Sequence, residues 1–220
     1  MLTLLLALAT LAPAEANAQA IALIKARQPA QALTVITPVV AELDRQVADA
    51  RSRGLAYCGP SVTEALLYAG IGVREKKRAE IIGRDLCEAQ YLQAYVYTDL
   101  GAKADAVAAL EKLTTLAPMN SGYFAELGFA YRAVGETTKS TAAYRKAIEF
   151  AGIVPPNAKE LEGRNRAKGL RGLGALAIDA GRLDEAEQLY RQSLDADATS
   201  EVARSQLKYI AEQRAKRTKG

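Results

Sequence analysis

Residues 121–150 read SGYFAELGFAYRAVGETTKSTAAYRKAIEF, and the pattern in this stretch recurs on both sides of it. Residues 170–194, LRGLGALAIDAGRLDEAEQLYRQSL, carry it again, as does a stretch that begins near Cys87. Four columns align across these windows: Ala94, Gly128 and Gly174; Gly101, Gly135 and Gly181; Ala106, Ser140 and Ala186; Leu110, Tyr144 and Tyr190. The first two windows are 34 residues apart (101 to 135), and the third follows after 46, which is 12 more. Such a period predicts stacked copies of one supersecondary unit.

The residue type in each aligned column is the one that a helical hairpin requires at that position. A small residue in the first column lets two helices cross closely. The glycine seven residues later ends the first helix, because a left-handed backbone costs glycine little. Apolar residues recur at three- and four-residue spacings, as in Leu183, Ala186, Leu189, Tyr190 and Leu194. We therefore predict successive pairs of antiparallel helices.

The two quoted stretches and the 34-residue period resemble the tetratricopeptide-repeat family, and Pro118 stands where that family places a turn proline. The resemblance covers residues 87–200 and implies three repeats in an all-α, right-handed α-solenoid of helix hairpins with helical caps. Residues 57–68, YCGPSVTEALLY, followed by repeats, also resemble a group of exported bacterial repeat proteins without an assigned activity.

The segments around the repeats are predicted to be helical as well. Residues 201–220 predict a capping helix and a disordered basic tail, and the helix places four apolar residues inward: Val202, Leu207, Ile210 and Ala211. The charged run after Pro156 lengthens the next helix at its start. Residues 19–86 form an N-terminal helical region, and whether it contains a degenerate repeat stays open.

The first residues have the composition of a targeting segment. Residues 2–12 are almost continuously apolar, and small residues at alternate positions follow as far as Ala20. This pattern predicts a signal peptide at residues 1–18 and export to the periplasm or cell envelope, with a short buried helix as the alternative. No Lys or Arg precedes the apolar run, which leaves open that the true start lies upstream.

Two cysteines, Cys58 and Cys87, are consistent with export, and a small even number of cysteines favours a disulfide in that compartment. Two reduced core cysteines remain the alternative. Cys58, Gly59, Pro60 and Ser61 also resemble a monothiol redox motif. We expect no redox activity there, because the surrounding strand–helix–strand pattern is not seen in the sequence.

The candidate binding residues follow from the resemblance, since ligands of this family usually lie on the first helix of each repeat, on the concave side. The matching positions predict a partner-binding set: Tyr91, Tyr95, Thr98, Phe129, Arg132, Lys168, Arg171 and Ile178. Aromatic and arginine side chains supply much of the free energy of protein interfaces. The alternative is that the aromatic rings pack internally while the basic side chains are only solvated.

The composition argues against catalysis and against several partners. The chain has no histidine, so the commonest general base and zinc ligand are missing, and we expect no enzyme activity, metal or cofactor. A formal charge of +4 does not indicate nucleic-acid binding. We expect a protein or peptide partner, with an acidic one favoured by the basic groups, and weak contact of the tail with anionic membranes. The alternatives are a self-associating structural component of the envelope and, less favoured, a thiol redox protein using Cys58.

Overall fold

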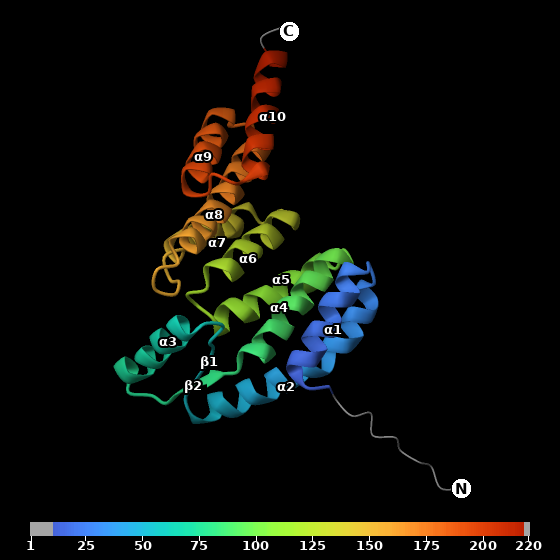
Figure 1. Ribbon diagram of the computed structural model, residues 1–220, viewed down its shortest axis with the longest axis vertical. Helices are drawn as coiled ribbons and strands as arrows, with labels where there is room; N and C mark the ends of the chain where they lie inside the picture. The colour runs from blue at the N-terminus through green and yellow to red at the C-terminus, as the bar shows by residue number, and fades with distance from the viewer. Residues whose placement is uncertain (1–10, 218–220) are drawn as a thin grey trace, which may run out of the picture.

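The computed structural model describes residues 11–217, which form ten helices and two short strands (Figure 1). The helices are α1 (Pro13–Lys25), α2 (Pro29–Arg53), α3 (Val62–Glu75), α4 (Arg84–Asp99), α5 (Lys103–Leu116), α6 (Ser121–Ala133), α7 (Thr137–Glu149), α8 (Lys159–Asp179), α9 (Leu183–Ala196) and α10 (Glu201–Arg217). The strands are β1 (Leu55–Cys58) and β2 (Ala79–Ile82). The prediction of an α-solenoid of helix hairpins is confirmed.

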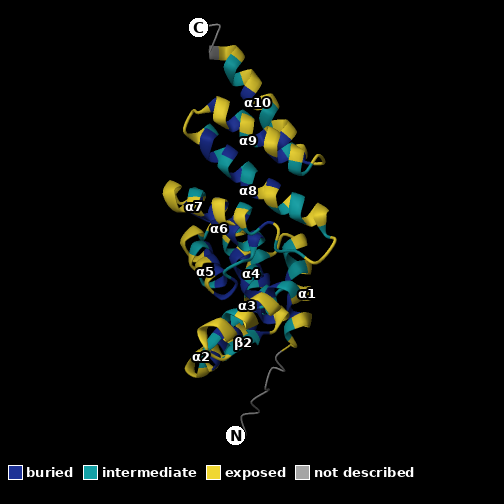
Figure 2. Ribbon diagram, turned by 90° about the vertical axis from the view of Figure 1, so that its left-hand side faces the viewer, coloured by how far each residue is buried: buried dark blue, intermediate teal, exposed yellow. Residues whose placement is uncertain are grey.

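Three hairpins, α4–α5, α6–α7 and α8–α9, stack along the long axis of the molecule (Figure 1). The first helix of each ends next to the predicted glycine, and Gly101, Gly135 and Gly181 have φ angles of 73°, 80° and 71°. Only glycine adopts this left-handed backbone without strain, so these residues set the reversal of the chain in every hairpin. Buried residues line the contacts between successive helices, and exposed residues follow their outer sides (Figure 2).

Glycine also sets how closely the two helices of a hairpin approach. A Cβ atom added to Gly128 would lie 2.7 Å from the ring of Tyr144, and one added to Gly174 would lie 2.9 Å from the ring of Tyr190. Ser140, which stands in the column of small residues, donates a 2.7 Å hydrogen bond from its hydroxyl to the Gly128 carbonyl. The small-residue columns therefore make room for the tyrosine rings of the neighbouring helix.

The N-terminal pair α1–α2 occupies the position of a preceding repeat. Both of its helices pack against α4, as both α6 and α7 pack against α8. Ala20, Ile36 and Val96 are fully buried in this contact. Residues 13–18, which the sequence assigns to the signal peptide, form the start of α1; Ala16 is buried there, and the Asn17 side chain donates a 2.8 Å hydrogen bond to the Asp85 carbonyl. Residues 1–10 lie outside the described part, and export stays a prediction.

A strand–helix–strand insertion, β1–α3–β2, separates α2 from α4 and stands to the side of the hairpins (Figure 1). Its strands pair in parallel, with Leu55 opposite Ala79 and Cys58 opposite Ile82. The sequence interpretation was wrong here, since it found no such pattern around Cys58 and treated residues 74–80 as a charged face or loop. Four-residue strands with no apolar alternation give almost no local signal. The sulfurs of Cys58 and Cys87 are 2.11 Å apart and form a disulfide that joins β1 to α4.

The C-terminal end differs in detail from its prediction. α8 is lengthened at its start as expected, and α10 covers the end of the α8–α9 hairpin. On α10, however, the buried residues are Ala203 and Ile210, while Val202 and Ala211 are exposed. The basic run was predicted to be disordered, but it belongs to α10 as far as residue 217, and Arg214 forms ion pairs with Asp184 and Glu187 of α9. Residues 218–220 lie outside the described part.

Within residues 11–217, no helix combines the length and the apolar character needed to cross a bilayer.

Candidate binding site

The first helices of the three hairpins form one continuous surface, which we call the first-helix face (α4, α6 and α8). Four of the predicted residues meet on it around a hollow of about 220 Å³, the aromatic hollow: Tyr91, Tyr95, Thr98 and Phe129. Tyr91, Tyr95 and Thr98 share one side of α4 because they are spaced by four and three residues. Phe129 comes from α6, and the buried Leu110 of α5 also lines the hollow.

Tyr95 and Phe129 expose large apolar rings to solvent at the mouth of this hollow. Each is 46% exposed, although aromatic rings of this size are among the side chains that gain most from burial. Asp99 and Glu126 also line the hollow, so carboxylates stand beside the rings. The hollow thus offers an apolar anchor point with a polar edge, which is the composition of a recognition site for a protein segment.

Tyr91 has a different role, because it forms a wall rather than an anchor. Its ring stacks on that of Tyr123, with the ring centres 5.6 Å apart. Burial raises the pKa of the Tyr91 phenol to about 12, so the group stays protonated near neutral pH and is able to donate a hydrogen bond. The stacked pair joins α4 to α6 beside the aromatic hollow.

The three basic residues of the predicted site are all engaged by acceptors of the same chain. Arg132 binds Asp179 through two hydrogen bonds, Nε to Oδ2 at 2.5 Å and Nη2 to Oδ1 at 2.8 Å. The Lys168 Nζ donates to Glu126 Oε1 at 2.6 Å. These two basic groups are therefore not merely solvated, as the alternative interpretation has it, and an acidic partner stays a prediction.

The same holds for Arg171, which lies farther along α8. Its Nη1 donates to the Ser200 hydroxyl at 3.1 Å and lies 3.6 Å from a carboxylate oxygen of Asp197. The hydrogen bonds from Arg132 lower the pKa of Asp179, which keeps that carboxylate ionised near neutral pH. The positive charge seen in the sequence is therefore balanced locally.

Ile178 does not belong to the aromatic hollow. It is partly buried and packs against the apolar cluster formed by α8, α9 and α10. The structure thus brings together four predicted residues, places two basic ones in bridges between α6 and α8, and assigns Arg171 and Ile178 to the C-terminal hairpin.

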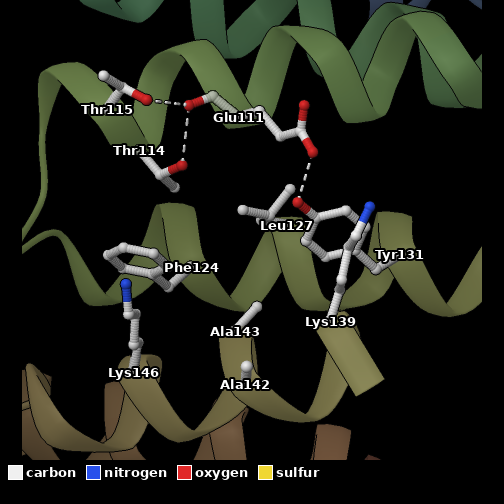
Figure 3. Close-up of a pocket in the computed structure, with 10 residues that line it drawn as sticks. All are labelled: Glu111, Thr114, Thr115, Phe124, Leu127, Tyr131, Lys139, Ala142, Ala143 and Lys146. Atoms are coloured by element: carbon white, nitrogen blue, oxygen red, sulfur yellow. Dashed lines mark hydrogen bonds between the residues drawn. The ribbon is translucent and has the colours of Figure 1, made fainter. Parts of the chain in front are cut away.

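A second groove, absent from the sequence interpretation, lies between α5 and α7 across α6 and has a volume of about 480 Å³ (Figure 3). The ammonium groups of Lys139 and Lys146 lie over the rings of Tyr131 and Phe124, 5.5 and 5.0 Å from the ring centres. The Tyr131 hydroxyl donates to Glu111 Oε1 at 2.5 Å. In the sequence, the seven-residue spacing of Lys139 and Lys146 on one helix is the signal that could have indicated this groove.

The polar groups of this second groove are already engaged. Thr114 and Thr115 donate their hydroxyl protons to carbonyls of their own helix, as Figure 3 shows for the bonds to Glu111. The lysines rest on aromatic faces, where the cation–π attraction holds them. Among the described residues no lysine or arginine is found over the exposed rings of Tyr95 and Phe129, so the aromatic hollow is the better candidate.

The residues of the redox alternative do not offer a thiol. Cys58 and Cys87 are bonded to each other, and both are fully buried. Thiol chemistry requires an accessible thiolate, and neither sulfur meets that condition in this state. Within residues 11–217, no group of three or more His, Cys, Asp or Glu side chains is arranged to hold a metal ion.

Comparisons with known proteins identify the repeat. A tetratricopeptide-repeat family model matches residues 88–120, which span most of the α4–α5 hairpin. A solved structure, the first tetratricopeptide-repeat domain of Spaghetti (RPAP3) bound to the HSP90 peptide SRMEEVD, is 17% identical with a TM-score of 0.47, covering 59% of this chain and 93% of that one. No curated protein matches the sequence. Residues 88–120 thus match a tetratricopeptide repeat, and the two hairpins that follow repeat its glycine turns and its helix packing.

Proposed function

We propose that the protein is a non-catalytic protein–protein interaction module that binds a segment of a partner protein on its first-helix face. The observation that carries this proposal is the pair of exposed rings, Tyr95 and Phe129, at the mouth of the aromatic hollow. Aromatic residues in a concave, otherwise well-packed surface are the usual centres of binding free energy. The protein serves as a scaffold or assembly factor.

The hollow favours an apolar or aromatic anchor on the partner. Its volume of about 220 Å³ holds one large side chain, and its lining is mainly apolar. The hydroxyl of Thr98 donates to the Ala94 carbonyl at 3.1 Å, which leaves its oxygen able to accept a hydrogen bond from the partner backbone. An acidic segment reaches Lys168 or Arg132 only by displacing Glu126 or Asp179. Exposed ion pairs contribute about 0–1 kcal/mol, so this exchange is inexpensive but adds little affinity.

The proposed location is the periplasm or cell envelope. The apolar run and the small residues after it support export, and so does the buried disulfide, because disulfides persist in oxidising compartments.

The test is a selection of peptides from a displayed random library on the immobilised protein, followed by calorimetry with the enriched peptides. We expect peptides with one apolar anchor, and a loss of at least tenfold in affinity, about 1.4 kcal/mol, for Tyr95→Ala and Phe129→Ala. Tyr209→Ala on α10 is the matched control, since Tyr209 is similarly exposed, and it should leave binding unchanged. Equal binding by all variants would place the site elsewhere, and no enrichment would contradict the proposal.

A self-associating structural component is the second candidate. Val202 and Tyr209, seven residues apart on one side of α10, are both exposed at the end of the solenoid. Sedimentation velocity distinguishes the two functions. Oligomers that grow with concentration and vanish in Val202→Glu would support self-association, whereas a monomer at all concentrations agrees with the interaction module.

A further inference from the structure

The insertion helix α3 carries apolar residues on its outer side as well as on the side that packs against the protein, where Tyr68 is fully buried. Its outer side carries a straight apolar stripe, Val62, Leu66, Ala69 and Val73, spaced by four, three and four residues as one helix face requires. Val62, Leu66 and Val73 are 77%, 69% and 81% exposed. Its inner side buries Glu64, which is only 4% exposed. Folding of this chain does not account for apolar residues placed outward.

Buried hydrogen bonds on the inner side of α3 fix the helix in place. The Glu64 carboxylate accepts hydrogen bonds from the side chains of Ser61 and Asn120, both at 2.9 Å. The Tyr68 hydroxyl accepts a bond from the Met119 backbone N–H at 3.1 Å. The Cys58–Cys87 disulfide ties the strand before α3 to α4. The stripe is thus held in one orientation on a rigid base.

A cluster of basic residues follows the stripe at the tip of the insertion. Arg74, Lys76, Lys77 and Arg78 are all exposed, and Val73 adjoins them. The acidic groups nearby, Glu75 and Glu80, lie 3.8 and 3.9 Å from Lys77 and Arg78 respectively, so the segment 74–80 keeps a net positive charge of 4 − 2 = +2. One end of the apolar stripe is therefore cationic.

The loop between α7 and α8 adds a second apolar wall on the same side of the molecule (Figure 1). With α3 it encloses an open space of about 710 Å³, lined by Val62, Thr63, Leu66, Leu67, Val154, Pro155 and Pro156. Thr63 is the only side chain of this lining that can form a hydrogen bond. Sites for a defined protein segment combine apolar surface with placed polar groups, whereas acyl chains need none.

From these features we infer that α3 is a membrane-surface element, whose apolar stripe enters the acyl boundary of an anionic bilayer while Arg74, Lys76, Lys77 and Arg78 contact lipid phosphates. An apolar helix face beside cationic side chains is the combination that holds interfacial helices at anionic membranes. The contact lies on the insertion, away from the aromatic hollow, so a bound partner and a membrane are accommodated together. It is separate from the contact expected of the C-terminal tail, where Arg214 is paired with α9.

The test uses the absence of tryptophan from the chain. Leu66→Trp places a single fluorophore in the stripe, and Val202→Trp on α10 is the control at another exposed apolar position. With vesicles of phosphatidylglycerol and phosphatidylcholine, we expect a blue shift and quenching by brominated acyl chains for Leu66→Trp only. No shift for Leu66→Trp, or an equal shift for both, overturns the proposal.

Co-sedimentation with the same vesicles tests the charges and the stripe. Lys76→Ala/Lys77→Ala and Leu66→Ser/Val73→Ser should each reduce the bound fraction at least tenfold, and vesicles of phosphatidylcholine alone should bind the protein weakly. Lys103→Ala/Arg145→Ala, a charge-matched control on α5 and α7, and Phe129→Ala should bind as the parent chain does. Because residues 1–10 accompany every variant, only differences between variants are compared. Unchanged binding by both α3 variants overturns the proposal, as does binding lost only on removal of residues 215–220.

Discussion

Glu64 on α3 accepts a 2.9 Å hydrogen bond from the side-chain amide of Asn120, which lies 56 positions later in the chain. Asn120 caps α6 at the same time, because its Oδ1 accepts a bond from the Tyr123 backbone N–H at 2.8 Å. One asparagine thus joins the insertion to the second hairpin and satisfies the end of a helix. The position of α3 against the solenoid depends on this buried polar contact rather than on apolar packing alone.

The same contact predicts a pH dependence of stability. Burial raises the pKa of Glu64 above its ordinary value of 4.5, so the native state binds a proton more tightly than the unfolded state. The free energy of unfolding that Glu64 contributes is therefore highest below pH 4.5 and falls as the pH rises through the raised pKa. Glutamine does not ionise, so the free energy of unfolding of Glu64→Gln should not fall over this pH range as that of the parent does. The free energy of unfolding of the variant minus that of the parent should therefore increase from about pH 4.5 to about 7.

Urea unfolding at several pH values measures that difference. Glu149→Gln, an exposed position, is the matched control and should give a constant difference. The carboxylates whose pKa is lowered by arginine, such as Asp179, lose their stabilisation only at lower pH and do not enter this window. A flat difference for Glu64→Gln would contradict the prediction.

Two glycines on different helices should respond oppositely to alanine. At Gly172 on α8, an added Cβ would lie 2.1 Å from the Tyr144 ring, so Gly172→Ala should destabilise by about 1–3 kcal/mol through overpacking. At Gly70, inside α3 and with no atom within 4 Å of an added Cβ, Gly70→Ala should stabilise by about 0.5–1 kcal/mol through helix propensity. Chemical denaturation of both variants checks the opposite signs, and destabilisation by both would refute the account.

The disulfide should stabilise the fold and resist reduction. Its two cysteines are 29 positions apart, which corresponds to about 3–4 kcal/mol from restriction of the unfolded chain. Cys58→Ala/Cys87→Ala should therefore unfold at a clearly lower urea concentration. Since both sulfurs are buried, mild reductant should leave the bond intact in the native protein and break it only in urea. Rapid thiol labelling of the native protein after treatment with mild reductant would contradict this.

The start of the mature chain should matter for stability. A chain that begins at Pro13 retains Ala16 in the core and the Asn17 hydrogen bond to Asp85, whereas one that begins at Gln19 lacks both. We expect the shorter chain to be less stable by roughly 2 kcal/mol, from one buried hydrogen bond and lost packing. Thermal unfolding of the two chains measures this. Equal stability would mean that cleavage after Ala18 leaves the fold intact.

The capping helix can be tested at two residues of different burial. Ile210 is almost fully buried against the last hairpin, so Ile210→Ala should cost about 2–4 kcal/mol. Val202, which the sequence placed inward, is 59% exposed, and Val202→Ala should change stability by less than about 0.5 kcal/mol. Comparable losses of stability for both variants would instead support the arrangement predicted from the sequence, in which Val202 faces inward.

The sequence predicts the hairpins well because their determinants are local. Gly101, Gly135 and Gly181 fix turns whose geometry depends on one residue each, and the tyrosines opposite the small-residue column follow the same period. The pairing of β1 with β2 is different, since it joins residues 24 positions apart, Leu55 with Ala79, through backbone groups that any sequence provides. Position in the repeat places Tyr95 and Phe129 on the first-helix face. It does not predict that Arg132 meets Asp179, which depends on the distance between successive hairpins.

The two joints along the first-helix face differ in their chemistry. α4 is joined to α6 by the stacked rings of Tyr91 and Tyr123, whereas α6 is joined to α8 by the ion pairs Glu126–Lys168 and Arg132–Asp179. Ring stacking is insensitive to dissolved salt, but exposed ion pairs weaken as ionic strength rises. The ion pairs between α6 and α8 are therefore the contacts of this face that weaken in salt, while the close packing of Gly172 on α8 against the Tyr144 ring of α7 does not depend on salt. Salt thus loosens the charged pairs that a partner segment would have to displace, and leaves the packing behind them in place.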